Sequence, residues 1–144
     1  MNQREFLLAA HHRHLAVACL DLLSDTYADD PRSLCARWRQ FEAGIEAHID
    51  AEERLLLPAF AEAAPSEAAF LRDDHARIRQ HMVQLGIEVD LHLVRVGTVR
   101  ALVDELHRHA AREDGNLYQW AAGAIDADTR ERLRASLDGE RTAA

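Results

Sequence analysis

Apolar residues recur at alternating spacings of three and four along four segments of the chain, the pattern of helices that pack side by side. The first two of these stripes comprise Leu8, His12, Leu15, Cys19 and Leu22, and then Leu34, Trp38, Phe41, Ile45, His48, Glu52 and Leu55. The third and fourth comprise Leu71, His75, Ile78, Met82, Leu85 and Val89, and then Val99, Leu102, Leu106, His109, Glu113, Asn116 and Trp120. The pattern predicts four long helices, and every stripe contains a histidine.

Residues that favour turns separate the four stripes. They are Asp29-Asp30-Pro31, Ala64-Pro65-Ser66 and Gly97-Thr98, with each proline suited to a first helical turn. Short connections make neighbouring helices antiparallel. We therefore predict an all-α fold, an antiparallel up-down-up-down four-helix bundle over residues 1–124. Residues 125–144 are expected to form a short C-terminal helix from Asp126 to Leu137, stopped at Gly139, and a frayed tail.

Composition favours one helical domain and removes several classes of partner. The chain has 144 residues, 48% of them hydrophobic, with only 3 prolines and 6 glycines. A net charge of −8 argues against nucleic acid as a partner. Without a membrane-length apolar run or a signal-peptide core, we expect a cytoplasmic monomer or homodimer with free thiols at Cys19 and Cys35.

The polar residues of the stripes are expected to meet at one depth of the bundle. Antiparallel helices rise equally from a turn, so each turn should lie midway in sequence between residues at the same depth. With position 50 representing the His48/Glu52 pair and position 111 the His109/Glu113 pair, the midpoints are 31, 62.5 and 93. The first two lie at or near Pro31 and Pro65, and the third lies four residues before Gly97.

Burying four histidines and two glutamates at one depth is costly unless something compensates their charge. A single His–Glu pair is most often a helix-surface pair, but the combination of four histidines and two such pairs favours a pair of metal ions. Each glutamate follows its histidine by four residues, so both side chains share a helix face. Carboxylates bridge two metal ions in known two-metal sites. Imidazole and carboxylate ligands without thiolate suit iron or manganese, and zinc would also bind.

Two motifs resemble the paired signatures of the hemerythrin-like (HHE cation-binding) family over roughly residues 5 to 124. They are His48-Ile-Asp-Ala-Glu52-Glu53 followed by Leu56-Leu57-Pro58, and His109-Ala-Ala-Arg-Glu113-Asp114 followed by Leu117-Tyr118. The resemblance implies a non-haem, oxo- or hydroxo-bridged di-iron centre with bridging carboxylates at Glu52 and Glu113. The implied ligands are His12, His48, Glu52, His75, His109 and Glu113. Pro58 is expected to kink the second helix.

The first helix offers three neighbouring histidines for one ligand position. His12 continues the apolar stripe, so it is the preferred ligand; His11 is its main rival, and His14 shares a face with Asp21. Histidines that lie off the stripes are expected to be solvated or in loops, namely His81, His92 and His107.

A difference from oxygen-carrying hemerythrins bears on function. Their third helix presents a second histidine four residues after the first, where this chain has Arg79, and a guanidinium offers no lone pair. The ligand set resembles instead di-iron proteins associated with iron–sulfur repair and with nitric oxide or peroxide stress. We expect a small gaseous or peroxide ligand (O2, NO or peroxide). The alternatives are an oxygen- or iron-sensing module, and a zinc-bound or metal-free structural bundle.

Overall fold

The computed structural model describes the backbone of residues 7–28 and 30–143, and this part of the chain contains seven helices and no strand. The predicted all-α class is therefore confirmed. The helices are α1 (Leu7–Ala28), α2 (Pro31–Leu55), α3 (Leu57–Ala63), α4 (Pro65–Asp90), α5 (Val96–Gly115), α6 (Leu117–Ala124) and α7 (Ala127–Ala143). There are more helices than predicted because two of the expected long helices are each divided in two.

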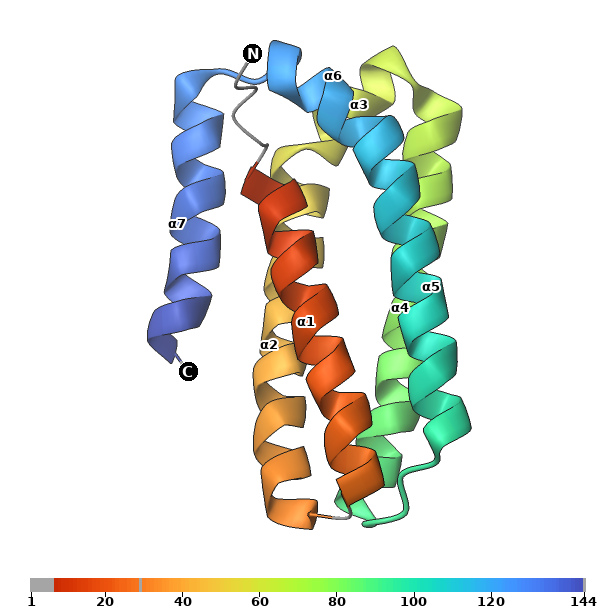
Figure 1. Ribbon diagram of the computed structural model, residues 1–144. Helices are drawn as coiled ribbons and strands as arrows, with labels where there is room; N and C mark the ends of the chain where they lie inside the picture. The colour runs from red at the N-terminus through yellow and green to blue at the C-terminus, as the bar shows by residue number, and fades with distance from the viewer. Residues whose placement is uncertain (1–6, 29, 144) are drawn as a thin grey trace, which may run out of the picture.

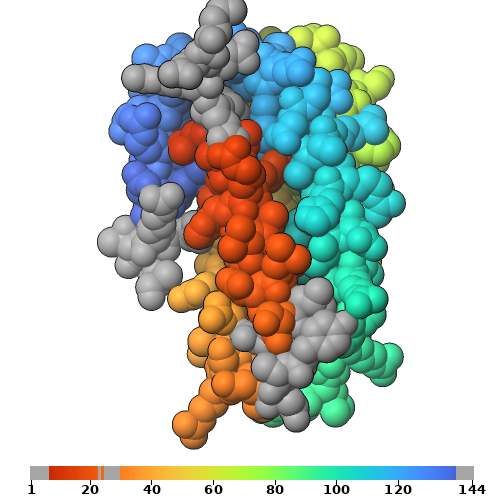
Figure 2. All heavy atoms as spheres, in the orientation of Figure 1, coloured from red at the N-terminus to blue at the C-terminus, as the bar shows by residue number. Residues whose placement is uncertain are grey.

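The four long helices α1, α2, α4 and α5 run side by side (Figure 1). Their turns between α1 and α2 and between α4 and α5 lie at one end of the molecule, while α3 and α6 lie at the other. Around this group α1 packs on α2 and α5, and α4 packs on the same two helices. In Figure 2, α1 covers the front of the molecule with α5 beside it. The interior enclosed by these helices is where the polar layer was expected.

The two prolines start helices, as the sequence predicted. Pro31 opens α2, and the Ser33 backbone N–H donates to Asp30 Oδ1 at 3.3 Å, which caps that helix. Pro65 opens α4, which has no side-chain cap. A proline fits the first helical turn because its missing N–H would have no partner there. These two turns therefore fall where the sequence placed them.

The third turn precedes Gly97 and occupies residues 91–95. The prediction of a turn at Gly97 was wrong, since α5 already begins at Val96. The buried carboxylate of Glu88 fixes the turn by accepting bonds from the Arg95 backbone N–H at 2.9 Å and from the Thr98 hydroxyl at 2.8 Å. The turn is centred on position 93, the midpoint required by ligands at equal depth.

The expected kink near Pro58 is a complete break between α2 and α3. Leu56 separates the two helices, and Pro58 lies in the first turn of α3, where it cannot donate a backbone hydrogen bond. The break changes which side chains face inward. Leu56 and Leu57 are fully buried, whereas Leu55, predicted to face the core, is only half-buried.

A second break, not predicted, separates α5 from α6 at Asn116. Its side-chain amide donates to the Arg112 carbonyl at 3.0 Å, the acceptor that its backbone N–H would use in a continuing helix. The predicted inward positions of Asn116 and Trp120 were therefore wrong: the first is exposed and the second half-buried. Leu117 and Tyr118 are buried instead.

The C-terminal helix α7 is longer than predicted. It begins after Asp126, whose carboxylate accepts the Thr129 backbone N–H at 2.8 Å, and it continues through Gly139 to Ala143. The expected stop at Gly139 was wrong, because a glycine inside a helix costs only about 1 kcal/mol and does not by itself end it. The helix packs against α2, and its Leu133 and Leu137 are buried.

The buried apolar residues form two clusters with the predicted polar positions between them along each long helix. One cluster contains Leu15, Ile45, Ile78 and Leu102, and the other contains Leu8, Leu56, Leu71 and Leu117. No helix in the described part of the chain is both long enough and apolar enough to cross a membrane. The polar layer thus lies deep in the bundle between two apolar regions.

Candidate metal centre

The six side chains predicted as metal ligands lie together in this polar layer. Helix α1 supplies His12, α2 supplies His48 and Glu52, α4 supplies His75, and α5 supplies His109 and Glu113. Both glutamates and His75 have no exposed surface, and His12 is the most exposed of the six, with 11% of its side chain accessible. Side chains from four helices converge here because the turns set equal depths in the bundle.

Within the layer the donor atoms form two overlapping groups. One contains His12, His48, Glu52 and Glu113, and the other contains Glu52, His75, His109 and Glu113. In each group one donor atom from every member lies within 4.8 Å of the others. The two carboxylates are shared, as expected when carboxylates bridge two metal ions.

Glu52 extends between the two groups through its separate oxygens. Its Oε1 lies 2.6 Å from His48 Nε2, and its Oε2 lies 3.0 Å from His75 Nε2. Glu113 Oε1 lies 2.8 Å from His109 Nε2 and 3.1 Å from His12 Nε2. Both close His–Glu pairs on single helices come from the spacing of four residues, one helical turn.

Comparison with known families agrees with this geometry. The sequence model of the hemerythrin HHE cation-binding domain matches residues 5–121, which is most of the chain. The chain belongs to the hemerythrin HHE family. Comparisons with curated proteins and with solved structures find no match. Cation binding is therefore the activity that the family implies, and the two donor groups are where this HHE chain could hold cations.

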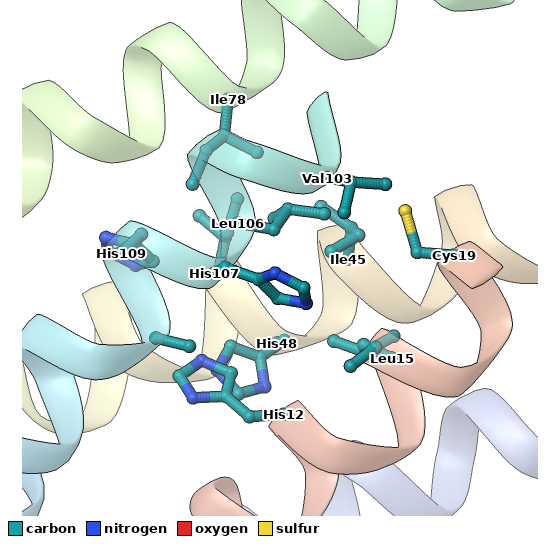
Figure 3. Close-up of a pocket in the computed structure, with 13 residues that line it drawn as sticks. His12, Leu15, Cys19, Ile45, His48, Ile78, Val103, Leu106, His107 and His109 are labelled. Atoms are coloured by element: carbon teal, nitrogen blue, oxygen red, sulfur yellow. The ribbon is translucent and has the colours of Figure 1, made fainter. Parts of the chain in front are cut away.

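Of the three histidines near the start of this HHE domain, His12 belongs to a donor group. His11 is buried, and its Nδ1 lies 2.7 Å from Nδ1 of His48, the nitrogen that faces away from the donor group. His14 is exposed and stacks against His11 at 6.2 Å between ring centroids. The His12 and His48 rings stack at 4.3 Å, side by side in Figure 3. His11 thus supports a candidate ligand from outside the group.

The other candidate histidines also have partners on their outer nitrogens. His75 Nδ1 lies 3.0 Å from Glu53 Oε1, and His109 Nδ1 lies 3.0 Å from Asp74 Oδ2. Such contacts keep Nε2 directed toward a metal and orient the ring. Sequence reasoning assigned no role to Glu53 or Asp74. The signal available was position, because each immediately adjoins a predicted ligand, Glu52 or His75.

Unsatisfied polar atoms indicate that the donor set fits a cation. Among the described residues, the buried atoms His12 Nδ1 and Glu113 Oε2 have no hydrogen-bond partner, and His109 Nε2 has only the close ion-pair contact with Glu113 Oε1 at 2.8 Å. Buried polar atoms without partners are uncommon in folded proteins. His109 Nε2 and Glu113 both belong to the donor groups, so a bound metal ion would satisfy them.

Protons partly compensate the buried carboxylates when no metal is bound. Burial lowers the pKa of His75, but hydrogen bonds and charges from Glu113 and Glu52 outweigh this and raise that pKa to about 10. The same competition between burial and Glu113 raises the pKa of His109. Burial prevails at His48 and lowers its pKa despite Glu52. At Glu113 burial would raise the pKa, but hydrogen bonds from Glu52 and neighbouring histidines lower it well below its ordinary value.

Tyr118 enters the same layer from α6, and sequence reasoning gave it no role. Its hydroxyl oxygen lies 2.9 Å from His48 Nε2, 2.5 Å from Glu52 Oε1, 3.1 Å from His12 Nε2 and 3.4 Å from Glu113 Oε1. Burial and the two carboxylates raise the pKa of Tyr118 well above its ordinary value, so without metal it remains a neutral phenol. Only its place in the second HHE motif could have suggested a role.

Arg79, at the position of the missing histidine, reaches the edge of the layer. Its guanidinium lies 3.4 Å from Glu53 Oε1 and 3.5 Å from Glu46 Oε2, and 38% of its side chain is exposed. Through Glu53 it supports the outer side of His75. Arg79 thus neutralises a carboxylate beside the site and adds no donor to it.

An apolar cavity of about 40 Å³ adjoins the site (Figure 3). Its wall includes the imidazoles of His12, His48 and His109 together with the apolar side chains of Leu15, Cys19, Ile45, Ile78, Val103 and Leu106. Burial raises the pKa of the Cys19 thiol to about 12, so it lines the cavity as an uncharged group. The exposed His107 also lines the cavity, a placement that the sequence did not indicate.

Proposed function

We propose that this HHE protein holds two non-haem iron ions and uses them to bind or react with O2, NO or peroxide. The observation that carries the proposal is a pair of donor groups that share Glu52 and Glu113 and adjoin an apolar cavity. The proposed ligands of one ion are His12 and His48, and those of the other are His75 and His109. We also propose a role in oxidative or nitrosative stress, or in iron–sulfur repair, because the ligand set resembles that of di-iron proteins associated with such stress and repair.

The donor chemistry supports iron. Four imidazoles and two carboxylates without a thiolate are ligands that suit iron or manganese. A structural zinc site differs, because it usually has four ligands including cysteine. Bound iron would supply electrons and open coordination positions. The chain itself would keep the ligand rings in place through outer contacts such as Glu53 with His75 and Asp74 with His109.

The cavity supports a small and largely uncharged partner. Its volume of about 40 Å³ exceeds the roughly 10–15 Å³ needed for one water molecule, yet it excludes larger metabolites. Mostly aliphatic walls offer few hydrogen bonds, so they retain a diatomic gas more readily than water or an ion. O2 and NO match this environment, and peroxide is the largest of the three partners we propose.

Metal analysis of protein purified without oxygen, followed by optical spectra under O2, NO and peroxide, tests the proposal. We expect close to two irons per chain. The double variant His48→Ala/His109→Ala removes one imidazole from each group and should lose at least one iron. His14→Ala is the matched control, because His14 lies outside both groups, and it should retain the full iron content.

Three results would contradict the proposal in whole or in part. Full iron occupancy in the double variant would show that the metal lies elsewhere. Stoichiometric zinc, or no metal, in protein purified without oxygen would favour a structural bundle. Spectra that do not change with any of the three small molecules would remove the proposed reaction while leaving the metal site intact.

A further inference from the structure

The Tyr118 hydroxyl oxygen is positioned as though it belongs to the coordination sphere of one metal ion. It lies between 2.5 and 3.4 Å from a donor atom of each of His12, His48, Glu52 and Glu113. These four residues form one of the two donor groups. The hydroxyl oxygen thus contacts both histidines of this group, at 2.9 Å from His48 Nε2 and 3.1 Å from His12 Nε2.

The distances are those between neighbouring ligands of a common ion. Nitrogen and oxygen donors bind such ions at about 2.0–2.2 Å, so two donors at a right angle lie about 3 Å apart. Within this group His48 Nε2 is 2.6 Å from Glu52 Oε1, and His12 Nε2 is 3.1 Å from Glu113 Oε1. The distances from the Tyr118 oxygen fall in the same range. This oxygen therefore extends the set of four donors to five.

The break at Asn116 is what brings Tyr118 to this place. In a continuous helix a residue five positions after Glu113 would point about 140° away from it, at 100° per residue. The interruption between α5 and α6 redirects the chain, and Tyr118 becomes 4% exposed and contacts Glu113 Oε1 at 3.4 Å. A third donor side chain thus follows the two of the His109–Glu113 pair within a few residues.

We propose that Tyr118 is a ligand of the metal ion bound by His12 and His48, coordinating through its phenolate oxygen. This inference rests on the proposed function. On coordination the phenol O–H bond breaks, an oxygen–metal bond forms, and the proton passes to solution; no electron is transferred in this step. Tyrosine oxygen is an established iron ligand in haem proteins, so the donor type suits iron.

The assignment makes the two metal positions unequal. The ion held by His12 and His48 gains an anionic oxygen ligand, which favours the ferric state. The ion held by His75 and His109 keeps more exchangeable positions, because Arg79 supplies no donor to it. We therefore assign the reaction with the small molecule to the ion held by His75 and His109. The ion that Tyr118 coordinates should remain ferric more readily than this one.

The visible spectrum of the ferric protein tests the proposal, because a phenolate bound to iron(III) produces a charge-transfer absorption that histidine and carboxylate ligands do not. We expect this absorption in the unaltered protein and in Tyr27→Phe, which removes the chain's other tyrosine. Tyr118→Phe should lose the absorption while retaining most of its iron. Absorption that persists in Tyr118→Phe would overturn the assignment.

A second measurement needs no substitution, which matters if Tyr118→Phe folds poorly. Resonance Raman spectra of the ferric protein should contain tyrosine ring modes that shift when the protein is made with ring-deuterated tyrosine. Iron content near two with neither the modes nor the absorption would mean that Tyr118 only donates a hydrogen bond, and would overturn this inference alone. Absence of bound iron would overturn both this inference and the proposed function.

Discussion

Asp74 on α4 and His109 on α5 are joined by a contact of 3.0 Å between Asp74 Oδ2 and His109 Nδ1. Asp74 is 5% exposed, and its other oxygen, Oδ1, accepts a hydrogen bond from the Arg77 guanidinium. Because Asp74 immediately precedes His75, α4 presents a candidate ligand and a support for another ligand in consecutive residues. The contact turns His109 Nε2 toward Glu113, from which it is 2.8 Å away.

Removing the Asp74 carboxylate should weaken metal binding at the position that includes His109. We expect Asp74→Ala to lower metal affinity by about 10–100-fold, the usual effect of losing the outer partner of a ligand histidine. Asp73→Ala is the matched control, because Asp73 is exposed and should leave affinity unchanged. Competition with a chelator would measure the difference. Equal affinities for the two variants would show that Asp74 does not orient His109.

The metal-free protein should lose stability as pH rises above neutrality. The pKa of His75 is raised to about 10 in the folded chain from about 6.5 when unfolded, so its contribution is complete below pH 6.5 and is lost between pH 6.5 and 10. The lowered pKa of Glu113 has the opposite effect, because its contribution to stability is lost as pH falls below the ordinary pKa of a glutamate carboxyl group. The lowered pKa of His48 likewise costs stability as pH falls below about 6.5, so the melting temperature of the metal-free protein should be highest near that pH.

Metal should oppose this loss, because it takes the place of the protons on His75 and His109. The difference between the melting temperatures of metal-bound and metal-free protein should widen from pH 6.5 to pH 9 and nearly vanish below about pH 5, where histidine protonation competes with metal. Scanning calorimetry of both forms across this range measures the difference. A constant difference from pH 5 to pH 8 would contradict the ligand set.

The three histidines of α1 should differ in their effect on metal content. His12→Ala removes a donor from the His12–His48 group and should lose one iron. His11→Ala should retain both irons but bind one more weakly, because His11 contacts the outer nitrogen of His48 at 2.7 Å. His14→Ala should match the unaltered protein. Loss of iron in His11→Ala with full retention in His12→Ala would reverse the assignment.

Filling the apolar cavity should slow access without removing metal. Val103 is half-buried and lines the cavity, so Val103→Phe should reduce its volume and slow the reaction of reduced protein with NO. Val83→Phe is the control, because Val83 is 64% exposed. Stopped-flow mixing measures both rates, and iron analysis checks that the site is intact. Equal rates would show that the small molecule enters by another route.

The reduced protein should react with O2 and end in the diferric state. Arg79 lies against Glu46 and Glu53 and supplies no donor, so an ion held by His75 and His109 would keep exchangeable positions. Two bound ferrous ions would each give one electron to O2, which would take up two protons and leave as peroxide, whereas a reversible carrier releases O2 unreduced. Stopped-flow spectra under O2, followed by evacuation, provide the test. A stable oxygen adduct that is fully released under vacuum would restore the carrier function.

Several features follow from the sequence alone because they depend on local spacing. A separation of four residues places His48 with Glu52 and His109 with Glu113 on single helix faces, and the structure has both pairs in contact. Prolines determined two helix starts for steric reasons. The turn-favouring residues Gly97-Thr98 misplaced the third turn. Its observed position, residues 91–95, is centred on 93, the midpoint expected when the ligands of neighbouring helices lie at equal depth.

Other features depend on where helices end and on which side chains meet across them, and only the tertiary structure decided these. Periodicity assumes a continuous helix, so it placed Trp120 inward, whereas the break at Asn116 brings Tyr118 into the polar layer. The supports of the histidines, such as Glu53 for His75 and Asp74 for His109, join different helices. No spacing along one helix encodes such contacts, because they arise from the relative rotation of packed helices.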